Sequence, residues 1–211
     1  ALNSYFRVTR STFDSNTAFE KGGAIHISGV QSAALFQNGC VFRSNSAVRD
    51  ANGGAISVEN NAALRIFNAT AIDNEASGTG NGGFLSAHFG GHIVLHNVKV
   101  SGTQSGPGGG GGAISALATK MTLNQVLIND CSAGSRGGGG ILLDGASSLD
   151  LVSGCTLSKN VATLESYGGH IRMASSKLRA HSMSTATNYI VEASGPAFPE
   201  PVTLNPPSTR A

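Results

Sequence analysis

The stretch "FRSNSAVRDANGGAIS", residues 42–57, contains the two short motifs that decide the fold. Phe42 and Asn45 form a Phe-x-x-Asn motif, and residues 53–56 form a Gly-Gly-Ala-Ile motif. The same pair stands upstream, at Phe13 with Asn16 and at residues 22–25. Further Gly pairs open residues 82–85, 111–114, 138–141 and 168–171. A motif that recurs in this way indicates a repeat protein.

The repeat has a period of about 29 residues. Aligned with the first Phe are residues that are mostly apolar: Phe13, Phe42, Ala71, Val100, Ile128 and Leu157. Each Gly pair is followed by a short alternating segment, such as "AIHIS" or "AISVE". Residues two apart in a strand point to the same side, so each unit contributes equivalent side chains to an interior.

The unit lacks the 3.6-residue apolar period of a helical repeat and the L-x-x-L-x-L pattern of leucine-rich repeats. The sequence therefore predicts an all-β fold, a right-handed parallel β-helix in which about 6–7 coils of one chain stack. We expect residues 1–190 to form this β-helix. Residues 191–211 are rich in proline and are expected to form an exit or capping segment.

The motif residues are expected to form the corners and the interior of each coil. Gly tolerates positive φ and lets two backbones approach closely, while the Ile that follows fills the core. The Asn is expected to take a left-handed conformation and to form a hydrogen-bonded ladder, interrupted at Thr103 and Cys131. The candidate structural and adhesive residues are Phe13, Asn16, Gly22, Gly23, Ile25, Phe42, Asn45, Gly53, Gly54, Ile56, Asn74, Gly82, Gly83, Gly111, Gly112, Ile114, Asn160, Gly168 and Gly169.

Polar, Gly-rich segments separate each Asn from the following Gly pair, and we expect them to form a flexible rim on one side of the rod. They comprise residues 46–52, 75–81, 104–111, 132–138 and 161–167. The sequence contains three cysteines. Cys40 and Cys155 share an interior column about 19 Å apart, too far for a disulfide, so they are expected to be free and buried.

The composition excludes several classes of protein. Only 12% of the residues are charged, and the net charge of +2 includes no basic run, so no nucleic-acid partner is expected. No apolar stretch is long enough for a membrane span. Asp73 and Asp130 share a column two coils apart, but the other acids are scattered, which argues against a pectate-lyase or hydrolase site.

Two further patterns are interpreted as structural. His88, His92 and His96 recur every four residues, but in a strand and turn they would point in different directions. The segment "GGHIRM", residues 168–173, is a degenerate Gly-Gly-Ala-Ile motif without accompanying acidic pairs. We therefore expect no catalytic residue, no metal and no cofactor.

Phe-x-x-Asn followed by Gly-Gly-Ala-Ile resembles the repeats of the polymorphic outer membrane proteins, best known from chlamydial autotransporters. The resemblance covers residues 1 to about 190, with the full motif pair in the first two units. It implies a β-helix, and it implies a surface-displayed adhesin whose partners are other proteins.

The leading expectation is a non-enzymatic structural or adhesive rod at the cell surface or outside the cell. Its partners would be a host receptor or neighbouring subunits of an assembly, contacted through a lateral or loop surface. Two alternatives stay open. One is a carbohydrate-binding or carbohydrate-cleaving β-helix of the pectin-lyase type, and the other is an intracellular scaffold subunit of a large complex.

Overall fold

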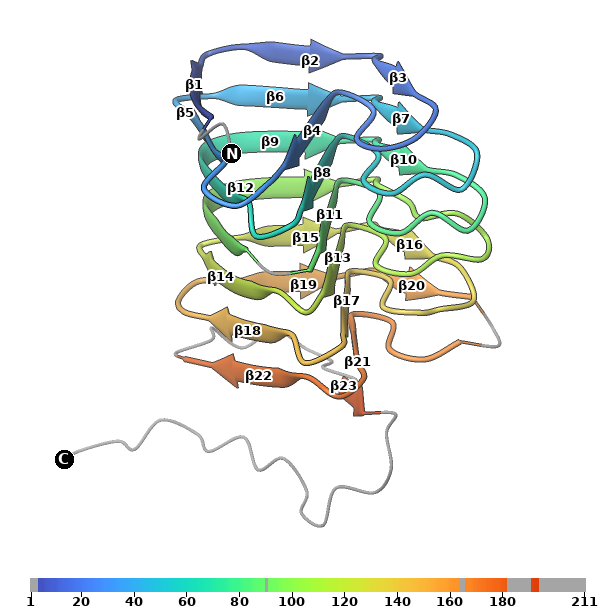
Figure 1. Ribbon diagram of the computed structural model, residues 1–211. Helices are drawn as coiled ribbons and strands as arrows, with labels where there is room; N and C mark the ends of the chain where they lie inside the picture. Colours follow the sequence, from blue (N-terminus) through green and yellow to red (C-terminus); the bar gives the residue numbers. More distant parts are fainter. Residues whose placement is uncertain (1–3, 90, 164–165, 182–190, 194–211) are drawn as a thin grey trace, which may run out of the picture.

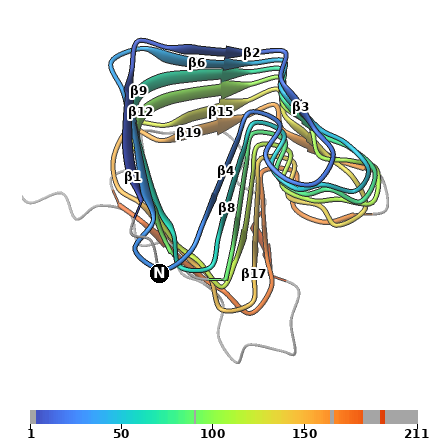
Figure 2. The same ribbon diagram turned by 45° about the horizontal axis from the view of Figure 1, so that its top comes forward.

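The computed structural model describes residues 4–89, 91–163, 166–181 and 191–193. These residues form only strands and turns, and every strand pairs with its neighbours in parallel. Nothing in this part of the chain could cross a membrane as an apolar helix. Viewed from its N-terminal end, the chain runs clockwise as it recedes, so the winding is right-handed (Figure 2). The predicted right-handed parallel β-helix is confirmed.

The coils stack into a rod with three flat faces (Figures 1 and 2). The first face contains β1 (Tyr5–Thr9), β5 (Ala33–Gln37), the first parts of β9 (Ala63–Ile72) and β12 (His92–Ser101), β14 (Lys120–Asn124), β18 (Ser148–Leu151) and β22 (Lys177–Ala180). The second face contains β2 (Thr12–Asp14), β6 (Cys40–Arg43), the later parts of β9 and β12, β15 (Leu127–Asn129) and β19 (Thr156–Ser158). The third face contains β4 (Ile25–Ser28), β8 (Ile56–Glu59), β11 (Leu85–His88), β13 (Ile114–Leu117), β17 (Ile141–Asp144), β21 (Ile171–Met173) and β23 (Val191–Ala193).

A lobe projects from the corner between the second and third faces, at the right of Figure 2. We use the name lobe for residues 17–21, 46–52, 75–81, 104–110, 132–137 and the described part of 161–167. It contains five two-residue strands, namely β3 (Thr17–Ala18), β7 (Ser46–Ala47), β10 (Glu75–Ala76), β16 (Ser132–Ala133) and β20 (Val161–Ala162).

The strand register follows the sequence repeat. On the third face, Ile56 lies between Ile25 and Leu85, and Ile114 continues the same row. On the second face, Phe13 pairs with Phe42, which pairs in turn with Ala71. Because a slip of one residue would turn each strand's apolar side chains outward, the alternating pattern fixes this register.

The interior of the rod is apolar and filled. Phe13 and Phe42 stack with ring centroids 5.0 Å apart, and Phe84 lies 5.6 Å from Phe42. In the third unit the Phe row contains the small Ala71, while the Ala position of the Gly-Gly-Ala-Ile motif contains the large Phe84. All three of Phe42, Ala71 and Phe84 are fully buried. The exchange of a large and a small side chain between two rows keeps the core volume constant, as dense packing requires.

The predicted division at residue 190 stays a prediction. Strand β23 adds one more rung to the third face, pairing with β21. Residues 194–211, in which the capping segment is expected, lie outside the described residues.

Candidate contact surface

The two glycines of each pair have different structural roles. The first, such as Gly53 with φ +74°, turns the chain at the corner before the third face. The second, such as Gly54, lies against the next coil, where an added Cβ would come within 2.1 Å of the carbonyl oxygen of Gly83. The same two conditions recur at Gly82 and Gly83. A Cβ would also clash at the first position, where it would lie 2.1 Å from the Ile56 carbonyl oxygen in the case of Gly53. Glycine is therefore required at both positions, and the pairs keep the coils in close register.

The Asn side chains form a ladder at the corner where the second face meets the lobe. Nδ2 of Asn16 donates to Oδ1 of Asn45 at 2.8 Å, and Nδ2 of Asn45 donates to Oδ1 of Asn74 at 2.9 Å. The backbone N–H of Asn45 also donates to Oδ1 of Asn74 at 3.0 Å. Asn45 and Asn74 are fully buried, so these bonds satisfy polar groups that water cannot reach.

The expectation that the Asn itself is left-handed is wrong. Positive φ occurs at the residue before it, at Ser44 (50°) and Asp73 (52°), for example. The strain of the corner is taken up one residue earlier, which leaves the Asn free to point its amide along the rod axis.

The ladder is interrupted at Thr103, as the sequence predicts, whereas at Cys131 the backbone still bonds to the next ladder residue. The Thr103 hydroxyl lies 2.9 Å from the carbonyl oxygen of Gly112 and 3.3 Å from Sγ of Cys131. The ladder resumes one coil later, where the N–H of Cys131 donates to Oδ1 of Asn160 at 3.1 Å.

The three cysteines are free and buried, as expected for Cys40 and Cys155. Burial raises the pKa of the Cys131 and Cys155 thiols. These groups therefore act as small core side chains and not as nucleophiles.

The expected flexible rim is instead an ordered stack of loops. Strand β7 lies between β3 and β10, and β16 pairs with β20. Between these short strands, further backbone bonds join successive loops. Ser77 donates to Ala47 at 2.8 Å, Gly108 to Gly78 at 3.0 Å, and Ser135 to Pro107 at 2.8 Å. Sequence reasoning treated the many glycines as a sign of mobility, whereas in the lobe they permit close backbone stacking.

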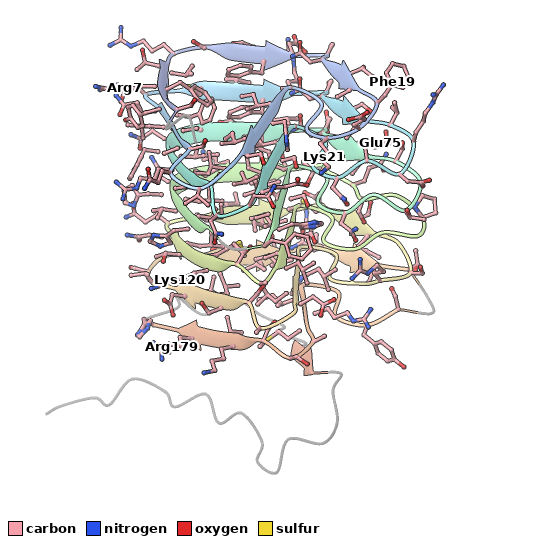
Figure 3. All side chains as sticks on the ribbon, viewed as in Figure 1. Arg7, Phe19, Lys21, Glu75, Lys120 and Arg179 are labelled. Atoms are coloured by element: carbon pink, nitrogen blue, oxygen red, sulfur yellow. The ribbon has the colours of Figure 1, made fainter. Side chains whose placement is uncertain are left out.

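Two ion pairs connect the lobe to the third face. Nζ of Lys21 lies 2.6 Å from Oε2 of Glu59, and an Arg136 nitrogen lies 3.1 Å from Oδ2 of Asp144. Glu59 is almost fully buried, so its charge requires this partner. Figure 3 shows Lys21 and Glu75 on the lobe side of the rod. The two ion pairs thus join the lobe to the third face.

The outer surface of the lobe carries exposed apolar side chains. Phe19 is 62% exposed and has the Arg49 guanidinium 4.9 Å from its ring centroid. Toward the other end, Tyr167 is 53% exposed with Arg172 at 5.7 Å, and Val161 is 60% exposed. Aromatic and arginine side chains are the residues most enriched in protein interfaces. Sequence reasoning missed them because neither aromatic residue belongs to the repeated motif.

The structure separates the three regularly spaced histidines. His88 ends β11 on the third face, where its Nε2 lies 3.1 Å from Oγ of Ser86. His92 and His96 lie on the first face, in β12. In the described part of the chain, no three His, Cys, Asp or Glu side chains gather at distances suited to a metal ion.

The remaining candidates have structural positions. Asp73 and Asp130 each take the left-handed corner position before the ladder residue, with φ of 52° and 53°. In "GGHIRM", Gly168 has φ +69° and Ile171 pairs with Ile141, so this segment continues the Gly-Gly-Ala-Ile row. Burial lowers the pKa of His170.

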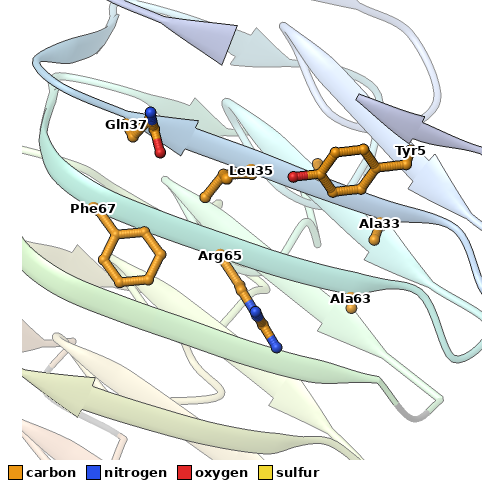
Figure 4. Close-up of a pocket in the computed structure, with 8 residues that line it drawn as sticks. Tyr5, Ala33, Leu35, Gln37, Ala63, Arg65 and Phe67 are labelled. Carbon is orange, nitrogen blue, oxygen red and sulfur yellow. The ribbon is translucent and has the colours of Figure 1, made fainter. Parts of the chain in front are cut away.

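The first face has a shallow hollow that no sequence pattern suggested (Figure 4). It has a volume of about 340 Å³ and is lined by Tyr5, Ala33, Ala34, Leu35, Gln37, Ala63, Arg65 and Phe67. Its residues come from three successive coils, which are about thirty positions apart in sequence.

Comparison with known proteins agrees with this geometry. The family described as the Chlamydia polymorphic membrane protein repeat matches residues 10–28 and 39–59. No curated protein and no solved structure gives a significant match. The two matched segments contain the complete Phe-x-x-Asn and Gly-Gly-Ala-Ile motifs, and the following coils repeat their geometry. The chain is therefore a β-helix repeat protein whose first two units are similar to the polymorphic membrane protein repeat.

Proposed function

We propose that the protein is a non-enzymatic structural or adhesive rod whose lobe contacts other proteins at the cell surface or outside the cell. The observation that carries the proposal is the presence of two aromatic–arginine clusters at the lobe, Phe19 with Arg49, and Tyr167 with Arg172 of the adjoining β21. Exposed aromatic rings on a rigid support bind partners at a low entropic cost.

The stacking of the lobe supports this proposal. Successive loops bond backbone to backbone, so the two clusters are held at a fixed separation along the rod. The family of the matched repeat supports a surface location and protein partners, such as a host receptor or neighbouring subunits. Binding would use extended contact area and no cofactor.

The proposal predicts that the lobe aromatics determine adhesion. Beads coated with the protein should adhere to cultured cells, and the double variant F19A/Y167A should reduce adhesion at least fivefold. Val30→Ala is the matched control, because Val30 is also an exposed apolar residue (59%) but lies outside the lobe. It should adhere like the wild type.

Circular dichroism and thermal unfolding would first establish that the variants fold. Equal adhesion by the wild type and F19A/Y167A would exclude the lobe as the contact surface. If the protein instead captured partners only from a cytosolic extract, the hypothesis of an intracellular scaffold would be favoured over that of a surface rod.

A further inference from the structure

The outer side of the first face gathers positive charge that is dispersed along the sequence. Its exposed cations come from four strands and span more than 170 positions: Arg7, Arg65, Lys120, Lys177 and Arg179. Figure 3 shows the side chains of Arg7, Lys120 and Arg179 along the same edge of the rod. The sequence contains no basic run because the fold, and not the chain order, brings these residues together.

Little negative charge offsets these cations. Asp150, on β18, is the acidic residue that the described strands present on this face. Within the described residues, none of the five cations lies within ion-pairing distance of a carboxylate, unlike Lys21, Arg43 and Arg136 elsewhere on the rod. A positively charged surface without internal partners favours an anionic ligand.

The register spaces the cations regularly along the rod. Leu35 separates Arg7 from Arg65 in one row of the sheet. In a parallel row, Ser148 separates Lys120 from Lys177. Two rungs correspond to about 10 Å, and the seven rungs from β1 to β22 cover about 29 Å. The positive potential also acts on His92, whose pKa is lowered by burial and by the neighbouring Lys120 and Arg65.

The hollow at the N-terminal end of this face adds an aromatic platform. Tyr5 is 66% exposed and lines the hollow together with Arg65 and Phe67 (Figure 4). The Gln37 side-chain amide is oriented so that its oxygen faces donors. In this orientation the oxygen accepts a hydrogen bond from Nε of Arg7 at 3.2 Å, which holds that guanidinium near the hollow. A ring face can stack on a sugar ring, and a guanidinium matches a carboxylate or sulfate with two parallel bonds.

We propose that the first face binds a linear acidic polysaccharide that lies along the rod axis, with one sugar ring on Tyr5 and its sulfates or carboxylates on the rows of cations. A flat sheet suits an extended chain. Duplex DNA is read by an element that enters a groove, whereas the strands of this face form a flat layer (Figure 2). A lipid surface calls for several apolar anchors, whereas among the described residues on the outer side of this face only Tyr5 is a well-exposed aromatic, and Leu35, Phe67 and Val94 are only partly exposed.

The proposal is independent of the lobe, because it uses a different face and a different ligand. Heparin is the probe, titrated calorimetrically into the full chain at 150 mM salt. The wild type should bind, and raising the salt should weaken binding with a slope that reflects several released counterions. The variant R65Q/K120Q should weaken binding at least tenfold, and Tyr5→Ala at least threefold.

The matched control is K99Q/K159Q. It removes the same charge from exposed positions on the second face and its corner, and it should change the affinity less than twofold. Thermal unfolding would verify that all variants fold. Three outcomes would overturn the proposal: no binding by the wild type, equal losses in R65Q/K120Q and K99Q/K159Q, or inorganic polyphosphate, duplex DNA or phosphatidylserine vesicles bound as tightly as heparin and through the same residues.

Discussion

At the scale of single residues, the fold depends on positions where a side chain is either forbidden or indispensable. The second glycine of each pair belongs to the first kind, because the neighbouring coil occupies the space that a Cβ would need. The ladder asparagines belong to the second kind, because a buried amide bonds both the coil above and the coil below.

Gly54→Ala tests the close approach. The new Cβ would lie 2.1 Å from the Gly83 carbonyl oxygen and 2.6 Å from the Glu75 nitrogen, and neither backbone can yield without separating two coils. We expect the free energy of unfolding, measured by urea titration, to decrease by about 3 kcal/mol. Gly39→Ala is the control, since nothing lies within 4 Å of its Cβ site and only its φ of +87° opposes the change. Gly39→Ala should lower the free energy of unfolding by about 1 kcal/mol. Equal losses of stability in the two variants would contradict the packing argument.

Asn45→Ala tests the ladder. Asn45 is fully buried, donates to the Phe13 carbonyl oxygen at 2.9 Å and accepts from Asn16. Its loss leaves buried polar groups unpaired, so we expect a destabilisation of about 2–3 kcal/mol in chemical denaturation. Asn16→Ala, at the exposed end of the ladder, should cost about 1 kcal/mol or less. If both variants lost the same stability, burial would not be the cause.

At the scale of the element, strands and lobe differ in how well the sequence predicts them. The alternation around Ile56 predicts a strand, its inward face and its partner in the next coil, because one period repeats in every unit. The lobe has no such signal. Its glycines suggest mobility, although backbone bonds stack the loops as closely as the strands.

The left-handed corner was misassigned for a related reason. Asn tolerates positive φ better than most residues, so the sequence pattern favoured Asn45. In the structure, Ser44 takes that conformation because the Asn amide must point along the rod axis to reach the next coil. Local propensity cannot show which of two neighbours bonds to another coil.

Hydrogen exchange distinguishes a stacked lobe from a mobile one. The N–H groups of Ser77, Gly108 and Ser135 donate to the adjacent coil, so NMR should find them protected at least a hundredfold relative to an open peptide. The N–H of Gly78 has no described acceptor and serves as an internal control that should exchange rapidly. Fast exchange at all four positions would restore the expectation of a flexible rim.

At the scale of the whole molecule, stability is a sum of interfaces between neighbouring coils. Ile114, in a central coil, is fully buried between Leu85 and Ile141, whereas Ile25, in the first coil, is only partly buried. Both Ile residues belong to the same interior row, but Ile114 has a coil on each side and Ile25 has a neighbouring coil on one side.

The cost of truncating an interior Ile should therefore depend on its coil. Ile114→Ala should cost about 3–4 kcal/mol, and Ile25→Ala about 1–2 kcal/mol, in equilibrium unfolding followed by circular dichroism. Similar costs would mean that the first coil is as well covered as the central ones.

The rod should also lose stability in mild acid. Burial, with smaller contributions from Arg136 and Lys21, lowers the pKa of His88 despite the nearby Glu59. Between that lowered pKa and the ordinary value of about 6.5, the unfolded chain binds the proton and the folded chain does not. Stability should thus fall as the pH drops from 7.5 to 5.5. His88→Gln should show a smaller drop in urea unfolding, and an unchanged drop would exclude His88 as the cause.

The lobe varies in length where the faces do not. The span from the Phe-row residue to the first glycine of the pair is nine residues at Phe13–Gly22, eleven at Phe42–Gly53 and ten at Ile128–Gly138, yet the rows on either side stay in register. Foreign peptides inserted at a lobe tip would therefore leave the core untouched. Such a chain could serve as a scaffold on which several grafted epitopes stand about 5 Å apart per coil, a spacing set by the backbone alone.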